Sequence, residues 1–199
     1  MKDISSMKRV LVAGSTGAGK TTLARAIAER LAIPFHEMDA LAIAGPHWEE
    51  NPRLLEDVSQ ISSGPSWIFD SFGYPQVRDL LWSRADTIVW LDYSRPVIMC
   101  RVLRRSAART LLRRRIFGGN VETAGDWFKA DHPAWWAWSQ HANRRVDIAT
   151  RCADPRFAPL EVIHLATPQA ARAWLSITTT TGDKTMANPA TVTKRLPRW

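Results

Sequence analysis

The residues best suited to chemistry form one short segment near the N-terminus, VLVAGSTGAGKTT at positions 10–22. Its three glycines allow successive backbone N–H groups to turn toward one point, and a lysine adds an ammonium group beside them. Hydroxyl side chains follow directly. Amides, an ammonium and a hydroxyl are the groups that bind phosphate oxygens and an associated metal ion. The residues expected to line such a site are Gly14, Ser15, Thr16, Gly17, Ala18, Gly19, Lys20, Thr21 and Thr22.

The spacing from Gly14 to Thr21 fits the pattern G-x-x-x-x-G-K-[ST]. In this pattern Lys20 reaches the β- and γ-phosphates of a nucleoside triphosphate, and the Thr21 hydroxyl binds Mg²⁺. A dinucleotide-binding loop is the alternative, but G-x-G-x-x-G is absent from this segment and that motif has no use for the lysine. The segment therefore predicts a site for ATP or a related nucleotide.

Around this segment, apolar runs alternate with amphipathic stretches of helical period. Strands are expected near residues 10–13, 33–39, 67–70, 87–92 and 160–165. Helices are expected near residues 23–31, 50–62, 77–84, from Ser94 into an arginine-rich stretch, before residue 150, and at 169–175. Strands separated by helices predict an α/β fold, with a five-stranded parallel sheet between two layers of helices.

Length and composition are those of one globular domain. The chain has 199 residues, 45% of them hydrophobic, and no apolar run approaches the roughly 20 residues that cross a bilayer. Two cysteines suit a reducing compartment, so we expect a cytoplasmic protein without membrane contact. Residues 178–199 contain four consecutive threonines and show no periodicity. They predict a disordered tail after a domain that spans residues 1–177.

The basic charge is concentrated in one segment. Between Asp92 and Glu122 lie eight arginines and no lysine or acidic residue, so this segment accounts for the whole net charge of +8. Arg101 and Arg105, four residues apart, fall on one helix face. Guanidinium groups suit phosphate binding because their planar fork contacts two oxygens. For the other arginines, a solvated helix face is an equal alternative: Arg104, Arg109, Arg113, Arg114 and Arg115.

Three aspartates stand at the carboxyl ends of expected strands: Asp39, Asp70 and Asp92. In open parallel sheets ligands bind beyond these ends, on the same edge as the phosphate loop. Acids at this edge can hold Mg²⁺ or accept the proton of an attacking hydroxyl. Each aspartate taken alone could instead cap a helix or start a turn.

The order of several sequence blocks resembles a known group of proteins. GSTGAGKTT, HEMDAL, WIFDSFGY, ADTIVWLD, RVLRR, FGGN and HLATPQAARAWL, over residues 8–176, look like the P-loop phosphotransferases of the nucleoside-monophosphate-kinase and shikimate-kinase branch. The likeness is greater to adenylate-kinase-like bacterial proteins labelled DNA topology modulation proteins. The resemblance implies a P-loop NTPase fold with sheet order 2-3-1-4-5 and a helical lid near residues 95–130.

The resemblance also implies roles for individual residues. The acid after the third strand, Asp70, would serve the Mg²⁺ shell and outranks Asp92 as a metal residue, while Asp39 would contact the acceptor and act as base. Arg101 and Arg105 would hold the nucleotide base and phosphates. The family's nucleotide kinases have D-G-F-P-R after the third strand, whereas Asp70 here begins DSFGYP and the nearest arginine is Arg78. This departure disfavours a nucleoside monophosphate acceptor.

Further side chains have weaker assignments. By the same resemblance, Arg144 and Arg145 could form a second phosphate clamp. Tryptophans near the expected cleft could stack on an acceptor, although packing is the more common role: Trp48, Trp135, Trp136 and Trp138. His36 and His164 lie in expected strands and are interpreted as structural.

The function that these features predict is a small-molecule kinase, which transfers the γ-phosphate of Mg·ATP to a small acceptor such as a nucleoside or nucleotide. Lys20, Asp39, Arg101 and Arg105 are its expected catalytic residues. Two alternatives stay open: a nucleotide-dependent nucleic-acid-binding protein that uses the arginine-rich helix, and a regulatory ATPase without an acceptor. The sequence leaves the oligomeric state open.

Overall fold

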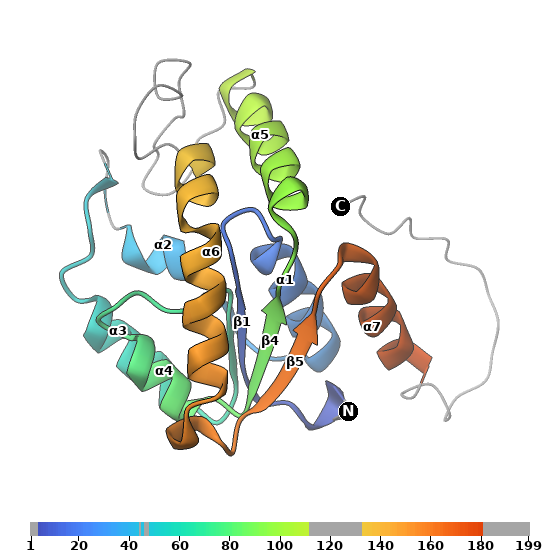
Figure 1. Cartoon of the computed structure of the whole chain (residues 1–199). Helices are drawn as coiled ribbons and strands as arrows, with labels where there is room; N and C mark the ends of the chain where they lie inside the picture. Colours follow the sequence, from blue (N-terminus) through green and yellow to red (C-terminus); the bar gives the residue numbers. More distant parts are fainter. Residues whose placement is uncertain (1–3, 44, 46–47, 112–132, 181–199) are drawn as a thin grey trace, which may run out of the picture.

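The computed structural model describes residues 4–43, 45, 48–111 and 133–180. A five-stranded sheet lies at its centre, and all neighbouring strands run parallel in the order β2-β3-β1-β4-β5 (Figure 1). The strands are Arg9–Gly14 (β1), Phe35–His36 (β2), Trp67–Phe69 (β3), Thr87–Leu91 (β4) and Glu161–Leu165 (β5). The predicted fold class and strand order are confirmed.

Seven helices and two short 3-10 turns surround the sheet within the described residues. The helices are Lys20–Leu31 (α1), Met38–Ala42 (α2), Leu54–Ser62 (α3), Arg78–Arg84 (α4), Arg95–Leu111 (α5), Pro133–Cys152 (α6) and Pro168–Thr180 (α7). The 3-10 turns are Ile4–Ser6 (η1) and Pro155–Phe157 (η5). None of these helices combines the length and apolar character needed to span a bilayer.

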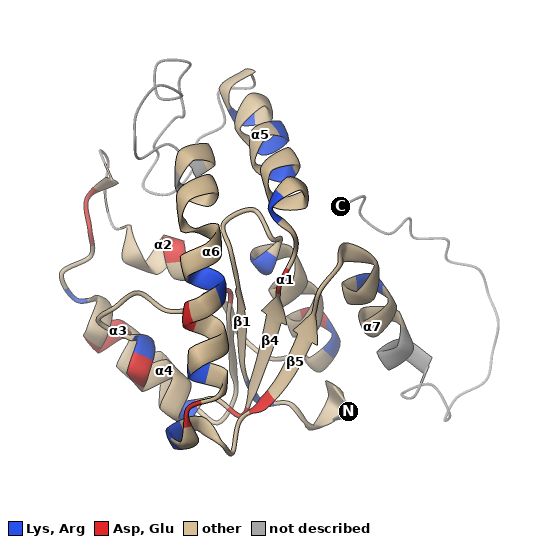
Figure 2. Ribbon diagram, viewed as in Figure 1, with Lys and Arg blue, Asp and Glu red and all other residues tan. Residues whose placement is uncertain are grey.

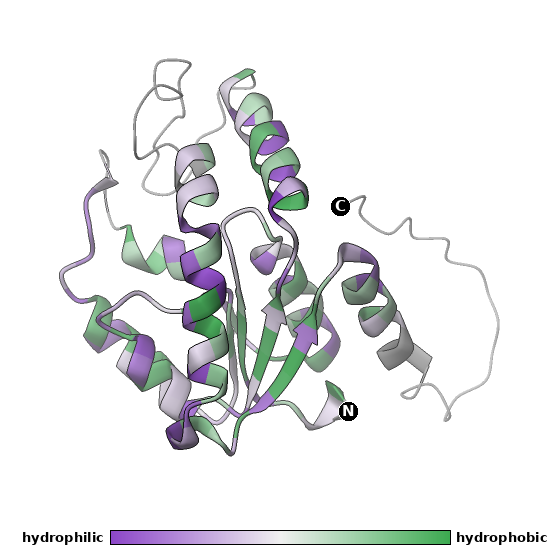
Figure 3. Ribbon diagram, viewed as in Figure 1, coloured by the Kyte–Doolittle hydropathy of each residue, from purple (hydrophilic) through white to green (hydrophobic). Residues whose placement is uncertain are grey.

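The central strand β1 divides the core into two parts. Val10 and Val12 belong to a cluster with α1, α5 and α7, whereas Leu11 and Ala13 belong to a cluster with α3 and α4. Alternating residues of β1 point to opposite faces of the sheet, so each face needs its own apolar cover. α1 and α7 cover one face, and α3, α4 and α6 cover the other (Figure 1). Figure 3 shows apolar residues along β4 and β5, with mixed surfaces on the surrounding helices.

Two boundaries differ from the sequence expectation. The second strand ends at His36, and Asp39 lies in the first turn of the short helix α2, which the apolar run over residues 33–39 did not reveal. α7 continues to Thr180, so the first threonines of the expected tail belong to this helix. Of the expected lid, α5 covers residues 95–111, while 112–130 and the rest of the tail lie outside the described residues.

Leu11→Ala tests how much the central strand contributes to the stability of the fold. Leu11 is fully buried in the sheet, so the cavity is expected to lower the free energy of unfolding by about 2–5 kcal/mol. Leu55→Ala is the control, since that side chain is 50% exposed and the change should cost below about 1 kcal/mol. Urea unfolding followed by far-UV circular dichroism measures both. Equal losses for the two variants would contradict the assignment of Leu11 to the core.

Candidate active site

The phosphate loop connects β1 to α1, and its backbone conformation requires glycine. Gly17 and Gly19 have φ of 86° and 92°, in the left-handed region that residues with a Cβ rarely adopt. A Cβ on Gly17 would also lie 2.4 Å from Cγ2 of Val102 in α5. Gly19 is the N-cap of α1, so the unpaired amides of the first helical turn face the loop. The local geometry is that of an anion-binding helix N-terminus.

Lys20 lies where the acids and arginines of the site converge. Its Nζ donates a hydrogen bond to the carbonyl oxygen of Ser15 at 3.2 Å. Burial lowers the pKa of Lys20, the negative charges of Asp39 and Asp70 oppose that shift, and the positive charges of Arg105 and Arg144 add to it. Four site residues from distant parts of the chain are therefore within electrostatic reach of this ammonium group.

Asp70 meets Thr21 as the sequence predicts. Thr21 Oγ1 donates a short hydrogen bond to Asp70 Oδ2, and the backbone N–H of Met38 donates to Oδ1 at 2.9 Å. The contact arises because β3 pairs directly with β1, which places the residue after Phe69 beside the phosphate loop. A hydroxyl and a carboxylate oxygen at the edge of a phosphate cradle are hard oxygen ligands of the kind Mg²⁺ prefers. Thr21 and Asp70 therefore fit the predicted metal role.

Other donors for Mg²⁺ are scarce in the part of the chain that the structure describes, where no three His, Cys, Asp or Glu side chains gather as a metal cluster. This arrangement suits an ion that takes most of its ligands from water and from substrate phosphates.

Asp92 occupies a different environment from the one predicted. It is buried at the end of β4, and its Oδ1 accepts from Arg145 Nε at 2.9 Å. Oδ2 lies 2.9 Å from His164 Nε2, and the His164 ring stacks on Trp90 at 4.4 Å between centroids. Both carboxylate oxygens are thus engaged away from Thr21. These contacts do not favour the metal role expected for Asp92, and they also remove Arg145 from the expected phosphate clamp.

Arg101 and Arg105 approach the loop from α5. Arg101 Nη1 donates to the carbonyl oxygen of Ala18 at 2.8 Å, and its guanidinium lies 5.1 Å from the centroid of the Tyr93 ring. Arg105 is close enough for its charge to act on Lys20. Figure 2 shows basic residues recurring along α5. Arg104 is exposed, and Arg113, Arg114 and Arg115 lie outside the described residues. A narrow pocket beside Arg101 is lined by Ala18, Gly19, Leu23, Leu91, Tyr93, Pro168, Ala171 and Arg172.

A larger cleft of about 530 Å³ opens on the other side of the loop. Asp39 and Asp70 line it together with four residues of the loop, Gly14, Ser15, Thr16 and Lys20, so six of the predicted site residues share one cavity. Most residues of the opposite wall of the cleft were not predicted as site residues from the sequence. They are Ser71, Phe72, Gly73, Tyr74, Pro75, Ala137, Gln140 and His141. One face of α6 contributes to this wall through residues 137, 140, 141 and 144. Their helical spacing is visible in the sequence, but the sequence does not show that this face turns toward the cleft.

Two guanidinium groups in the cleft lie against Phe72. The Cζ atoms of Arg78 and Arg144 are 4.3 and 4.8 Å from the centroid of its ring. Burial lowers the pKa of both arginines, and the charge of Arg144 lowers that of Arg78 further. Arg78 was noted in the sequence only as the arginine nearest to Asp70. Its place in the cleft depends on Nε, which donates to the carbonyl oxygen of Gly73 at 3.1 Å.

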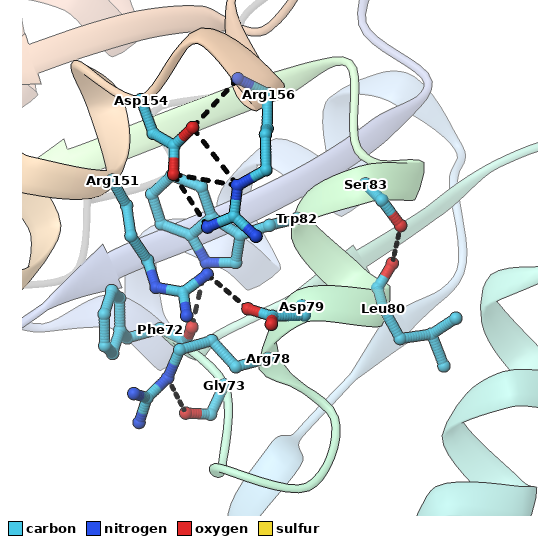
Figure 4. Close-up of polar contacts among 10 residues, drawn as sticks. All are labelled: Phe72, Gly73, Arg78, Asp79, Leu80, Trp82, Ser83, Arg151, Asp154 and Arg156. Atoms are coloured by element: carbon cyan, nitrogen blue, oxygen red, sulfur yellow. Dashed lines mark hydrogen bonds and ion pairs between the residues drawn. The ribbon is translucent and has the colours of Figure 1, made fainter.

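A third arginine, Arg151, lies beside Phe72, which forms part of this wall. Arg151 of α6 pairs with Asp79 of α4, with 2.6 Å between Nη1 and Oδ1, and lies near Phe72 and Trp82 (Figure 4). The indole N–H of Trp82 donates to the carbonyl oxygen of Phe72 at 3.0 Å. The contacts connect α4, α6 and the turn after β3.

Of the tryptophans for which stacking on an acceptor was the less common alternative, none whose side chain the structure describes lines this cleft. Trp48, Trp135 and Trp138 are more than half exposed, and Trp138 packs under the guanidinium of Arg95 at 4.9 Å. The side chain of Trp136 lies outside the described part. His36 packs on Phe69, with 5.3 Å between ring centroids, and burial lowers its pKa.

Comparison with protein families places the N-terminal part of the chain beside nucleotide-binding ATPases. Residues 10–69 match the model of the ATPase family associated with various cellular activities (AAA). A putative 26S proteasome regulatory subunit homolog of Methanothermobacter thermautotrophicus is 34% identical over 64 residues. The homolog of Methanothermobacter marburgensis matches equally. The aligned segment covers 31% of this chain and 17% of each relative.

Several solved structures of kinases align with most of the chain. A shikimate kinase from Acinetobacter baumannii in complex with shikimate is 15% identical, with TM-score 0.48, and the alignment covers 92% of this chain and 98% of that one. A gluconokinase from Sinorhizobium meliloti 1021 is 19% identical, with TM-score 0.44 and coverages of 90% and 98%. A deoxyadenosine kinase from M. mycoides with bound dCTP is 12% identical, with TM-score 0.47 and coverages of 86% and 98%.

None of the similar proteins named above carries the DNA topology modulation label. At these identities and TM-scores, the P-loop NTPase fold rests on this chain's own strand order and on the loop between β1 and α1.

Proposed function

We propose that the protein transfers the γ-phosphate of Mg·ATP to a small acceptor bound in the cleft. The observation that carries the proposal is one cleft that both groups of residues line. Gly14, Ser15, Thr16 and Lys20 of the phosphate loop form part of its wall, and Asp39 and Asp70 form another part. A triphosphate held along the loop amides would present its terminal phosphate to the cleft.

The chain's own residues divide the work of transfer. Lys20 and Arg105 supply positive charge where negative charge develops on the transferred group. Asp39 lies at the cleft wall, where it can accept the acceptor's proton. Magnesium bound through Thr21 and Asp70 would supply charge neutralisation on the β- and γ-phosphates. Arg101 and Arg105 on α5 would hold the nucleotide base and phosphates, as the family resemblance implies; Arg101 already contacts the loop at the Ala18 carbonyl oxygen.

The arginines against Phe72 suggest that the acceptor carries an anionic group. Arg78 and Arg144 line the same cleft as Lys20, and their planar guanidinium groups match carboxylate or phosphate oxygens. The second phosphate clamp expected of Arg144 and Arg145 is thus proposed for Arg144 and Arg78, because Arg145 is paired with Asp92.

A regulatory ATPase without an acceptor is the second candidate, and the AAA match over residues 10–69 is the observation that favours it. A regulatory ATPase would have no use for the cleft that Arg78 and Arg144 line. The two functions differ in one measurement: an acceptor from a panel of hydroxy acids, sugars and nucleosides stimulates ADP release by a kinase and has no effect on a regulatory ATPase.

Lys20→Ala is expected to abolish ATP turnover, with a loss of at least about 100-fold, because the ammonium group at the phosphates is removed. The fold should persist, as judged by circular dichroism and an unchanged urea midpoint. Lys8→Ala, on an exposed side chain before β1, is the matched control and should keep full turnover. A Lys20→Ala protein with wild-type phosphotransfer would refute the assignment of the loop.

Arg144→Met tests the proposed anion clamp. Loss of one charged contact is expected to lower kcat/KM about 10- to 100-fold for an acceptor that bears a carboxylate or phosphate, with little change in the KM for ATP. Arg53→Met is the control, since Arg53 is exposed and pairs only locally with Glu56 at 3.0 Å. Shikimate, gluconate and sugar phosphates serve as charged probes, and adenosine as an uncharged one. An equal loss with charged and uncharged probes would contradict the clamp.

A further inference from the structure

Tyr74 and Asp39 form a hydrogen-bonded pair inside the cleft. The Tyr74 hydroxyl donates to Asp39 Oδ1 at 3.1 Å, and both side chains line the cavity that also contains Lys20. They come from different elements, Asp39 from the first turn of α2 and Tyr74 from the turn that follows β3. Their contact therefore depends on the tertiary fold.

The turn that carries Tyr74 is held in one shape. Gly73 has φ of 100°, and its N–H donates to Ser71 Oγ at 2.8 Å. Its carbonyl oxygen accepts from Arg78 Nε, a contact drawn in Figure 4 beside Phe72. A Cβ at Gly73 would lie 2.8 Å from the Arg78 Cα, so the turn packs directly on α4. These constraints fix where the next residue, Tyr74, places its hydroxyl.

The phenol is a permanent donor in this position. Burial raises the pKa of Tyr74, and the negative charges of Asp39, Glu50 and Asp70 raise it further. The hydroxyl thus keeps its proton at physiological pH. Lys20 is the cation that faces Asp39 across the cleft. A carboxylate with Oδ1 anchored by a fixed donor has its second oxygen oriented by the same contact.

An oriented carboxylate is useful only for an acceptor that has a proton to lose. Water has a pKa of about 15.7 and alcohols are comparably weak acids, so an attacking hydroxyl benefits from a base. The attacking oxygens of a phosphate acceptor are already ionised at neutral pH. They would also bring a dianion next to Asp39 and Asp70, where like charges repel.

We propose that the attacking group of the acceptor is a hydroxyl rather than a phosphate, and that Tyr74 is the positioning residue that aims Asp39 at it. This inference rests on the proposed function. The hydroxyl oxygen forms a bond to the γ-phosphorus while the bond between that phosphorus and the β,γ-bridging oxygen breaks. The hydroxyl proton passes to Asp39 Oδ2, and ADP leaves with the bonding electron pair.

The test compares the products, kcat and KM of Mg·ATP turnover by the full chain. Adenosine and AMP are matched acceptor probes, since they share a base and differ in the attacking group, and ³¹P NMR distinguishes a new ester from a new anhydride. Shikimate and gluconate extend the hydroxyl set. ATP hydrolysis, in which water is the attacking O–H group, is measured in parallel and gives a readout even when no probe is accepted.

The expected products are phosphate esters, or inorganic phosphate from water. Asp39→Asn should lower the rate by about 100-fold or more. Tyr74→Phe removes the donor that orients the carboxylate, so kcat should fall by about 10-fold while the KM for ATP stays unchanged. Ser83→Ala, which removes a hydroxyl that only donates to the Leu80 carbonyl oxygen on α4, should match the wild type.

Three results would overturn the inference while leaving phosphotransfer in place: faster conversion of AMP to ADP than of adenosine to AMP, Asp39→Asn turnover equal to the wild type, or a Tyr74→Phe protein with the wild-type kcat. Failure of the proposed function is recognised separately, because Lys20→Ala would then turn over ATP as the wild type does, or the wild type would show no turnover with any probe or with water.

Discussion

The site depends on one buried carboxylate, that of Asp70, which joins three elements. It directly follows β3, accepts from Thr21 at the start of α1, and accepts from the backbone N–H of Met38 at the start of α2. A buried carboxylate is costly unless its oxygens are hydrogen-bonded, and here both oxygens have donors. Because Asp39 follows Met38 in the chain, the contact that holds Asp70, the proposed metal residue, also places Asp39, the proposed base.

Some arginines of this basic chain are paired with acids or backbone oxygens, whereas others line the cleft. Arg145 is balanced by Asp92 and Arg151 by Asp79, and Arg101 donates to a carbonyl oxygen of the phosphate loop. Arg78 and Arg144 instead line the cleft, where burial and, for Arg78, neighbouring guanidinium groups lower the pKa. An anion in the cleft would relieve this repulsion, so the electrostatic cost of assembling the arginines favours binding of a negatively charged ligand.

The part of the site that follows from local sequence was predictable, since the loop from Gly14 to Thr21 has a fixed spacing. The preference for Asp70 over Asp92 came from the family resemblance, which implies that the third strand lies beside the strand before the loop, as β3 lies beside β1. Asp92 follows an equally apolar strand, yet its partners Arg145 and His164 come from other elements, so its surroundings depend on packing that no local pattern encodes. Arg78, Tyr74 and the inward face of α6 were missed for the same reason: helical spacing shows that residues share a face, but only tertiary contacts show what that face meets.

Helix α6 contacts both Tyr93, which lines the narrow pocket, and Phe72, which lines the cleft. Near its middle, His141 Nε2 lies 2.9 Å from the carbonyl oxygen of Tyr93. A carbonyl can only accept, so this nitrogen must carry the proton. Tyr93 lies under Arg101, while one turn further along α6 Arg144 lies against Phe72 in the cleft wall. A rotation of α6 that moved His141 would move Arg144 as well, because residues in one helix move together. The side proposed for the nucleotide and the side proposed for the acceptor therefore share one helix.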